Sequence, residues 1–289
     1  MNPSPAADGD PAKPLSFSSY SFLTAVFLLT LASCTERTDR KEPVPVPDSA
    51  AIKGQEKKAK DSVAALSRKK KKIYLTFDDG PNKGTRNVLG VIEEEKVPAS
   101  FFIVGIHTTD TRQQEETWKM LQTDSTIELC NHSYSHAHNH YTSYYEKPGT
   151  IVTDFNYSNG KLGFRNKIAR TPGRNAWRIG AIDHTDIYDS KAAVDSLYAA
   201  GYDVMGWDIE WTFDHKTLAP DADTALLLRR VYNLLEAKKT RTADHLVFLA
   251  HDQAFQKPEY VEELRYVVQQ LKNNPEYELM LATQYPGIR

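Results

Sequence analysis

Short apolar runs alternate with longer amphipathic segments from Ile73 onward, and this alternation constrains the fold more than any other feature. Strands that alternate with helices predict βαβ units and a mainly parallel sheet. About seven such units in roughly 217 residues favour a barrel-like α/β domain, although an open doubly wound sheet fits the periodicity nearly as well. The strand candidates are Ile73–Asp78, Ala99–Gly105, Ile127–His132, Lys167–Thr171, Tyr202–Trp207, His245–His251 and Tyr277–Leu281. The helix candidates include Arg86–Glu95, Gln113–Gln122, Ser190–Ala200, Ala222–Lys238 and Glu259–Lys272.

The composition is that of one large globular domain. Of the 289 residues, 40% are hydrophobic and 26% are charged, so the chain is long enough to bury a substantial core. The formal net charge of -2 gives no electrostatic footprint for nucleic acid. We therefore expect no nucleic acid among the partners.

An apolar run near the N-terminus, Phe22–Ala32, is short for a membrane span and typical of a signal-peptide core. It ends in Leu31-Ala32-Ser33-Cys34, which resembles the bacterial lipobox. The resemblance implies that residues 1–34 are a lipoprotein-type signal peptide and that Cys34 is lipidated. The protein would then be anchored to a bacterial membrane in the cell envelope, on the periplasmic side or at the surface. A plain signal peptide or anchor with an incidental cysteine is the alternative.

Residues 35–72 are charged, contain Pro43, Pro45 and Pro47, and include no aromatic side chain. Such a composition buries too little apolar surface to offset the entropy of ordering the chain. We predict a disordered tether over this segment, followed by a single folded domain over residues 73–289.

Two adjacent carboxylates, Asp78 and Asp79, follow the strand-like run Ile73–Phe77 and precede a Gly-Pro turn signal. Neighbouring carboxylates repel each other, so both remain ionised easily only in water or beside a cation. A metal ion would take one as a ligand and leave the other free as a base. An ordinary Asp-rich turn is the alternative for this stretch considered alone.

Two histidines four residues apart, His132 and His136, follow the strand candidate Ile127–His132. They lie on one face if the segment after the strand is helical, which is a usual arrangement for shared metal ligation. The carboxyl ends of parallel strands converge on one site, so the histidines and the Asp pair are expected near each other. Two histidines and one carboxylate suit a catalytic Zn²⁺ or a similar divalent metal, whereas an incidental pair is the alternative. Cys130 shares the parity of His132, and we interpret it as a core residue.

The segments Thr76-Phe-Asp-Asp-Gly80 and His132-Ser-Tyr-Ser-His136 resemble the first two motifs of the polysaccharide deacetylases, the NodB-homology domain of carbohydrate esterase family 4. The resemblance extends from about Ile73 to Leu281. It implies a distorted, incomplete (β/α)7-type barrel. By the same resemblance, Asp78 is the catalytic base and the metal ligands are Asp79, His132 and His136.

Arg170-Thr-Pro-Gly-Arg174 resembles the third motif of this family. Arg170 takes the place of the arginine that holds the base, and the backbone near Gly173 takes the place of the oxyanion site. The aromatic residue that usually follows the proline, and that forms one wall of the substrate groove, is replaced here by Gly173. A structural arginine that pairs with any nearby carboxylate is the alternative for Arg170.

Trp207-Asp-Ile-Glu-Trp211 resembles the fourth motif, which usually presents Asp-Trp. Glu210 and Trp211 take those two places, with Glu210 supporting catalysis and Trp211 contacting substrate. Asp208 is a competing candidate for the acidic position. A pair of tryptophans buried in the core is the alternative for this stretch.

Leu246-Val-Phe-Leu-Ala-His251-Asp252 resembles the fifth motif, a strand that brings a histidine to the site. His251 would be the general acid. Leu249 has the same strand parity and would line the pocket for the acetyl methyl group.

These resemblances imply a metal-dependent hydrolase that removes N-acetyl groups from an N-acetylhexosamine polysaccharide, with an envelope glycan such as peptidoglycan as the favoured substrate. Zn²⁺ is the expected metal, with Co²⁺ or Ni²⁺ as alternatives. We expect a monomer whose partners are the acetylated polysaccharide and, through the lipid anchor, a membrane. The rival hypotheses are an O-acetyl carbohydrate esterase of the xylan type, a glycan-binding lipoprotein that has lost activity, and a purely structural envelope lipoprotein.

Overall fold

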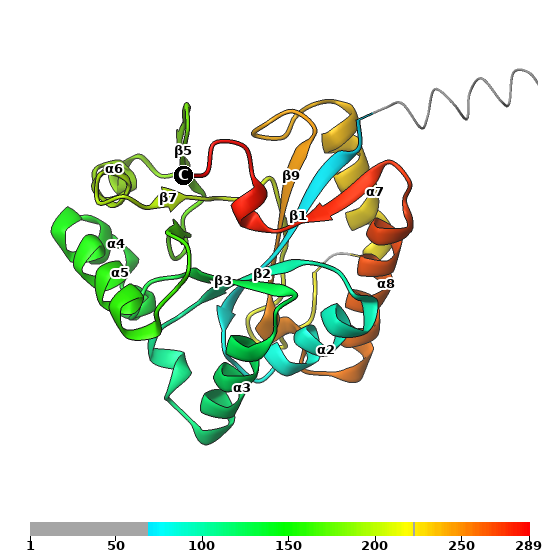
Figure 1. Ribbon diagram of the computed structural model, residues 1–289, viewed down its shortest axis with the longest axis horizontal. Helices are drawn as coiled ribbons and strands as arrows, with labels where there is room; N and C mark the ends of the chain where they lie inside the picture. Colours follow the sequence, from blue (N-terminus) through cyan, green and yellow to red (C-terminus); the bar gives the residue numbers. More distant parts are fainter. Residues whose placement is uncertain (1–68, 222) are drawn as a thin grey trace, which may run out of the picture. The chain divides into compact units, whose positions relative to one another are not determined.

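The computed structural model describes residues 69–221 and 223–289. Within those ranges the chain forms one ten-stranded sheet flanked by helices (Figure 1). No helix in these ranges is both long and apolar enough to cross a bilayer. The predicted signal peptide with Cys34, and the predicted tether up to residue 68, lie outside the described residues.

The strands follow the order β6-β5-β7-β4-β3-β2-β1-β9-β8, and β10 pairs with β1. All neighbouring strands are parallel except β5, which is antiparallel to both β6 and β7. The strands are β1 (Lys71–Gly80), β2 (Ala99–Ile103), β3 (Ile127–Asn131), β4 (Ile168–Ala169), β5 (Ala176–Ile179), β6 (Ile182–Thr185), β7 (Asp203–Val204), β8 (Ile209–Trp211), β9 (His245–His251) and β10 (Tyr277–Met280). The helices are α2 (Thr85–Glu95), α3 (Arg112–Thr123), α4 (Tyr141–Tyr145), α5 (Pro148–Leu162), α6 (Lys191–Ala199), α7 (Thr224–Glu236) and α8 (Pro258–Asn273).

Strand β1 pairs with three other strands of the sheet. It pairs with β9 along one edge, while β10 and β2 share its other edge, at its beginning and its end respectively. Its residues 73–78 are all buried, as expected for a parallel strand that is covered on both faces. The pairing sets Asp78 directly beside His251 of β9, so the sheet register itself brings the first and fifth sequence motifs together.

Strand parity separates the two faces of the sheet. Odd-numbered residues of β1, such as Ile73 and Phe77, belong to a core packed against α2, α3, α7 and α8. Even-numbered residues point to the opposite face, where Tyr74 belongs to a second core with Phe102 and Cys130. Because successive strand residues alternate between faces, Asp78 is carried to this second face. Cys130 is buried there, as predicted.

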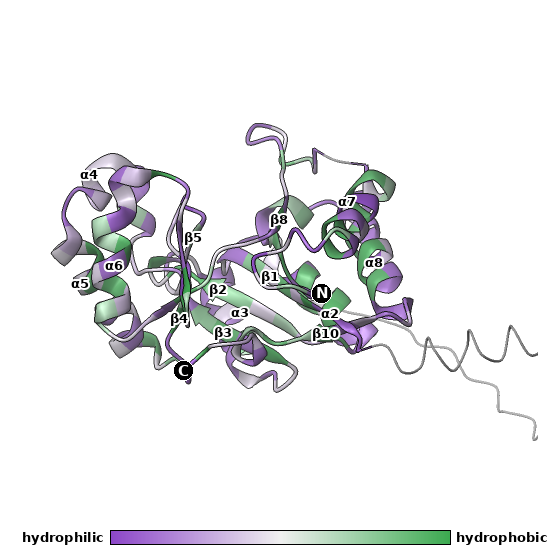
Figure 2. Cartoon of the chain, turned by 90° about the horizontal axis from the view of Figure 1, so that it is seen from above, coloured by the Kyte–Doolittle hydropathy of each residue, from purple (hydrophilic) through white to green (hydrophobic). Residues whose placement is uncertain are grey.

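Helices gather on two sides of the strands, with α4–α6 on one side and α2, α7 and α8 on the other (Figures 1 and 2). The first group packs on the short strands β4 and β7, and its core includes Phe155, Leu197 and Val204. Figure 2 also shows the chain after β8 projecting beyond the body of the domain, between the two groups of helices.

The predicted α/β class and incomplete barrel are confirmed, with local differences. Strand β1 begins at Lys71, so the predicted tether extends two residues too far. Helix α5 was not predicted, because its glycines and β-branched residues argue against a helix. It forms nevertheless, since Ile151, Phe155 and Ser158 are spaced to bury one face. The β5–β6 hairpin and the three-residue strand β8 were also missed.

Candidate active site

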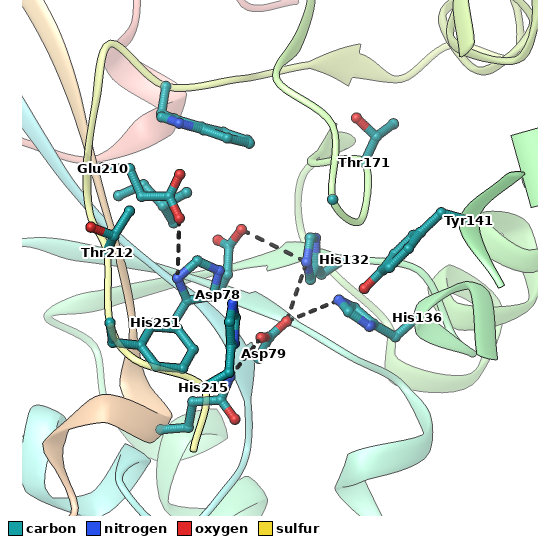
Figure 3. A pocket seen from close by; sticks show the side chains of 15 residues that line it. Asp78, Asp79, His132, His136, Tyr141, Thr171, Glu210, Thr212, His215 and His251 are labelled. Carbon is teal, nitrogen blue, oxygen red and sulfur yellow. Dashed lines mark hydrogen bonds and ion pairs between the residues drawn. The ribbon is translucent and has the colours of Figure 1, made fainter. Parts of the chain in front are cut away.

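A pocket of about 290 Å³ lies at the carboxyl ends of the central strands (Figure 3). Of the ten residues predicted to act in catalysis, metal binding or substrate binding, Arg170 and Trp211 are the two that do not line it. The eight that do are Asp78, Asp79, His132, His136, Gly173, Glu210, Leu249 and His251.

Arg170 lies directly beneath the pocket, fully buried, and holds Asp78. Its Nη1 donates to Asp78 Oδ1 at 2.8 Å and to the hydroxyl of Thr76 at 2.9 Å. Its Nε and Nη2 donate to the carbonyls of Met205 and Gly206, and its guanidinium carbon lies 4.0 Å from the ring centroid of Phe102. All three guanidinium nitrogens therefore have acceptors, which a buried charge requires. Asp78 Oδ1 is occupied, and Oδ2 faces His132 Nε2 at 3.7 Å.

A backbone irregularity turns Asp79 toward the same pocket as Asp78. In a regular strand two successive side chains would point to opposite faces. The pairing of β1 with β2 shifts register between Asp78 and Gly80, and Asp79 takes a left-handed backbone conformation with φ of 74°. Aspartate adopts this conformation more readily than most residues. The bulge thus converts an alternating pair of carboxylates into a convergent pair.

The side chains of Asp79, His132 and His136 form a group suited to a metal ion. One donor atom from each lies within 4.8 Å of the other two, and Asp79 Oδ1 is 3.5 Å from His132 Nε2 and 3.1 Å from His136 Nε2. His132 Nδ1 lies 2.8 Å from the carbonyl of Arg170. A carbonyl only accepts, so Nδ1 carries a proton and Nε2 is the ring nitrogen that faces Asp79.

The buried Oδ1 of Asp79 has no hydrogen-bond donor among the described residues. A buried carboxylate oxygen without a hydrogen-bond donor is costly unless a cation or a proton compensates it. Burial opposes the ionisation of Asp79, yet the imidazoles of His132 and His136 hold its pKa well below the usual range. Burial lowers the pKa of His136, but Asp79 outweighs it and the net shift is upward. A carboxylate and two imidazoles therefore fit a divalent metal at this place.

His136 reaches the group from a loop and not from the helix face that the four-residue spacing suggests. Ser133 and all residues from His136 to Asn139 have positive φ angles. Asp154 stabilises this loop by accepting hydrogen bonds from the backbone and hydroxyl of Ser135 at 3.3 and 3.0 Å. Positive φ angles are energetically unfavourable for residues other than glycine, so they persist only where surrounding contacts fix them.

His251 ends β9 on the side of the pocket opposite the histidine pair. Its Nδ1 lies 3.8 Å from Glu210 Oε1 and is buried without a hydrogen-bond partner among the described residues. Burial raises the pKa of Glu210, although the nearby imidazole of His251 opposes the rise. Asp208 points elsewhere and accepts backbone N–H groups of Arg241 and Val247, while burial raises its pKa to about 6. The geometry thus favours Glu210 over Asp208 as the carboxylate beside His251.

The interpretation of Trp211 as a substrate-contacting residue is wrong. Its side chain is only 2% exposed and packs in the core against Phe248 and Phe255. The reason is parity along β8, which points Glu210 into the pocket and therefore Trp211 toward the helices. The tryptophan that lines the pocket is Trp207, four residues earlier in the same motif.

Several pocket residues were missed in the sequence. Phe213 and His215 come from the segment after β8, where the Phe213 ring lies 5.3 Å from the ring of His251 and 4.8 Å from that of His215. Gln253 Nε2 lies 3.3 Å from Asp79 Oδ2. Tyr141 approaches from α4. Each follows a motif residue closely, but neither periodicity nor spacing indicates that these loops fold back over the pocket.

Asp252 fastens the loop after β1 to the end of β9. It is completely buried and accepts hydrogen bonds from the side chains of Asn82 and Thr85. A β-carbon on Gly80 would lie 2.7 Å from Asp252 Oδ2, and one on Gly84 would lie 1.9 Å from its carbonyl oxygen. Burial raises the pKa of Asp252 to about 8, and the hydrogen bond from Thr85 opposes the rise.

This raised pKa predicts a pH-dependent stability. With this pKa the folded protein keeps a proton on Asp252 that the unfolded chain releases above about pH 4. The contribution of the protonated Asp252 to stability is therefore complete below about pH 4 and is lost as the pH rises to about 8. We expect the free energy of unfolding of the wild type to fall relative to that of Asp252→Asn by at most about 1.4 kcal/mol per pH unit in this window. Urea unfolding of both proteins in chelator, at about pH 5 and about pH 8, measures the difference. Parallel pH curves would show that Asp252 is already ionised in the fold.

The fold and the pocket define an α/β protein with a candidate metal site at the carboxyl ends of its strands. Residues 65–185 match the family model described as polysaccharide deacetylase. A chitin disaccharide deacetylase of Vibrio alginolyticus is 24% identical over 216 residues, which is 53% of this chain and 50% of that protein. A chitooligosaccharide deacetylase of Rhizobium leguminosarum bv. trifolii is 56% identical over 39 residues, 13% of this chain and 18% of that protein. The chain thus spans half or less of the length of these two curated relatives.

Solved structures share the fold. A CE4 (carbohydrate esterase family 4) esterase of Streptococcus mutans superimposes with a TM-score of 0.55 at 23% identity, covering 76% of this chain and 90% of that one. A polysaccharide deacetylase of Bacillus cereus gives a TM-score of 0.54 at 22% identity, covering 74% and 93%. Residues 65–185 therefore resemble the polysaccharide deacetylase family in sequence, and the described domain shares the fold of these two structures.

Proposed function

We propose that this protein is a metal-dependent deacetylase that hydrolyses the N-acetyl groups of an N-acetylhexosamine polysaccharide. The observation that carries the proposal is that one pocket brings together two different functional groups. Asp78 lies beside the Asp79–His132–His136 group, and His251 lies beside Glu210. Amide hydrolysis requires this combination, because a proton must leave the water and another must reach the amine.

Asp78 is the proposed base. Arg170 occupies its Oδ1, which fixes the carboxylate plane and leaves Oδ2 directed at the pocket. Oδ2 accepts a proton from water as the water oxygen attacks the acetyl carbon. A divalent metal held by Asp79, His132 and His136 supplies Lewis acidity toward the acetyl carbonyl and the attacking water. Backbone N–H groups near Gly173 are the proposed further stabilisers of the oxyanion.

His251 is the proposed acid. It donates a proton to the amide nitrogen as the carbon–nitrogen bond breaks, so that the products are acetate and a free amino sugar. An amine leaves poorly without this proton. The Glu210 carboxylate, 3.8 Å from His251 Nδ1, attracts an imidazolium at this position. Leu249 of the same strand lines the pocket and is the proposed contact for the acetyl methyl group.

The substrate proposal draws on the relatives and on the N-terminus. Two relatives carry the names chitin disaccharide deacetylase and chitooligosaccharide deacetylase, which makes N-acetylglucosamine oligomers the first substrates to test. A lipid anchor at Cys34, as the sequence predicts, would hold the enzyme in the cell envelope, so an envelope glycan such as peptidoglycan is the proposed physiological polymer. Zn²⁺ is the proposed metal, with Co²⁺ and Ni²⁺ as alternatives.

Acetate release tests the proposal. The purified protein, stripped of metal with a chelator and then reloaded with Zn²⁺, Co²⁺ or Ni²⁺, is assayed on N-acetylglucosamine oligomers, peptidoglycan and acetylated xylan. We expect acetate from the amide substrates after reloading and a loss of at least about 100-fold in the stripped protein.

Release from acetylated xylan alone would instead identify an O-acetyl esterase. If the protein binds metal and glycan but releases acetate from none of these substrates, the result would favour the hypothesis of a glycan-binding protein without activity. His132→Ala is the matched control, since it removes one metal ligand, and it must lose both the metal and the activity.

A further inference from the structure

The wall of the pocket beside the third motif has no side chain of its own. Gly173 has a φ of +63°, a left-handed conformation that glycine adopts without strain. A β-carbon placed on it would lie 3.1 Å from Cε1 and 3.3 Å from Cδ1 of Tyr141. The Tyr141 ring therefore already occupies the space that a side chain at position 173 would need.

Neighbouring contacts fix the Tyr141 ring in this place. It meets the His136 ring edge to face, with centroids 5.9 Å apart and planes at 83°. The guanidinium of Arg174 lies 5.7 Å from the centroid of the Tyr141 ring. Both interactions have geometries that are favourable for an aromatic ring.

Helix α4, which begins with Tyr141, is itself fastened by its two other tyrosines. The hydroxyl of Tyr145 donates to the carbonyl of Pro172 at 2.7 Å, which ties the helix to the residue just before Gly173. The hydroxyl of Tyr144 donates to Asp154 at 2.9 Å, the carboxylate that also stabilises the His136 loop. The position of Tyr141 relative to Gly173 and His136 is therefore determined by several independent bonds.

The ring remains available to a ligand. Tyr141 is only partly buried and lines both the main pocket and a second hollow of about 570 Å³ that also includes His107 and His138. Figure 3 shows the ring reaching toward His136, with its hydroxyl at the pocket end. That hydroxyl makes no hydrogen bond to any of the described residues, so it is free to bind a polar group of a ligand.

We propose that Tyr141 is the aromatic platform on which the sugar ring of the substrate packs, supplied by α4 in place of a side chain at position 173. This inference rests on the proposed function for the identity of the sugar. Tyr141 is a specificity-determining residue that binds the sugar ring, whereas the acetyl group is handled by the residues on β1, β8 and β9. Removal of the Tyr141 ring should therefore slow the hydrolysis of sugar substrates and leave the hydrolysis of small acetyl compounds nearly unchanged.

The test compares two substrates and one binding measurement. Tyr141→Ala should lower kcat/KM for N-acetylglucosamine oligomers by about tenfold or more, mainly through a higher KM. Turnover of 4-nitrophenyl acetate, which has no sugar ring, and the affinity for Zn²⁺ should each change by less than about threefold. Tyr141→Phe keeps the ring and should retain most of the activity. Tyr188→Ala, which alters a tyrosine that is 82% exposed and outside both hollows, is the control.

A binding measurement separates this inference from the proposed function. Calorimetry compares oligomer binding to Zn²⁺-loaded Asp78→Asn with oligomer binding to the Zn²⁺-loaded double variant Asp78→Asn/Tyr141→Ala. Weaker binding after Tyr141→Ala supports the platform even if the wild type releases no acetate. Equal losses on both substrates, or a loss of Zn²⁺ affinity, would show that Tyr141 acts by positioning His136 and would overturn the proposal. Unchanged oligomer binding, or no binding in either background, would overturn it as well.

Discussion

Replacement of Asp78 by asparagine is expected to lower kcat on N-acetylglucosamine oligomers by about 10²- to 10⁴-fold, the range typical for loss of a general base. The KM should change little, because a base that acts on water contributes to the transition state and not to ground-state binding. The fold should persist, since the asparagine side-chain oxygen can still accept the hydrogen bond that Arg170 Nη1 gives to Asp78 Oδ1. Steady-state acetate release and circular dichroism measure the two effects.

The neighbouring residue provides a matched control for this variant. Asp79→Asn makes the same chemical change one position along the same bulge, but it removes a proposed metal ligand. We expect Asp78→Asn to retain bound Zn²⁺ and Asp79→Asn to lose it, as measured by metal content after dialysis. Both variants should be inactive, for different reasons. If Asp78→Asn kept turnover within about threefold of the wild type, or lost metal as Asp79→Asn does, the assignment of base and ligand would be wrong.

The sequence predicts those site residues whose positions depend only on where a strand ends and on the alternation of side chains along it. Asp78, His132 and His251 each follow a recognisable apolar run. In a parallel sheet such strand ends share one edge, and a period of two brings Leu249 to the same face as His251. These positions require no knowledge of the loops. For the same reason the overall class, strands alternating with helices, could be predicted from periodicity alone.

The remainder depends on local backbone geometry that periodicity does not encode. Asp79 reaches the pocket because of a left-handed residue and a register shift, whereas alternation alone would point it away. His136 reaches the metal group through a loop of positive φ angles and not through a helical turn. Trp211 was misplaced because a three-residue strand is too short to show a period. Tyr141 depends on the packing of α4, which is a tertiary effect.

Replacement of Arg170 by methionine is expected to reduce the free energy of unfolding by about 3–5 kcal/mol, the usual cost of breaking a buried ion pair. Methionine fills a similar volume but leaves Asp78 as an uncompensated buried charge. It also leaves the carbonyls of Met205 and Gly206 without the donors that Arg170 supplies. Arg170→Lys keeps the charge but cannot donate in three directions from one plane, so its loss should be smaller. Urea unfolding of the metal-free proteins measures both variants.

A double-mutant cycle with Asp78→Asn separates the two roles of the arginine. If the charge pair dominates, the double variant Asp78→Asn/Arg170→Met should lose less free energy of unfolding than the two single variants lose together. The difference should be about 1–3 kcal/mol, because the double variant has no carboxylate for methionine to leave unpaired. Additive losses would show that Arg170 stabilises the fold mainly through the two carbonyls. Coupling would mean that the buried guanidinium stabilises the fold through its pairing with the proposed base. Stability and the orientation of Asp78 would then depend on one side chain, and a variant that repairs the fold without restoring a forked donor at position 170 should remain impaired in turnover.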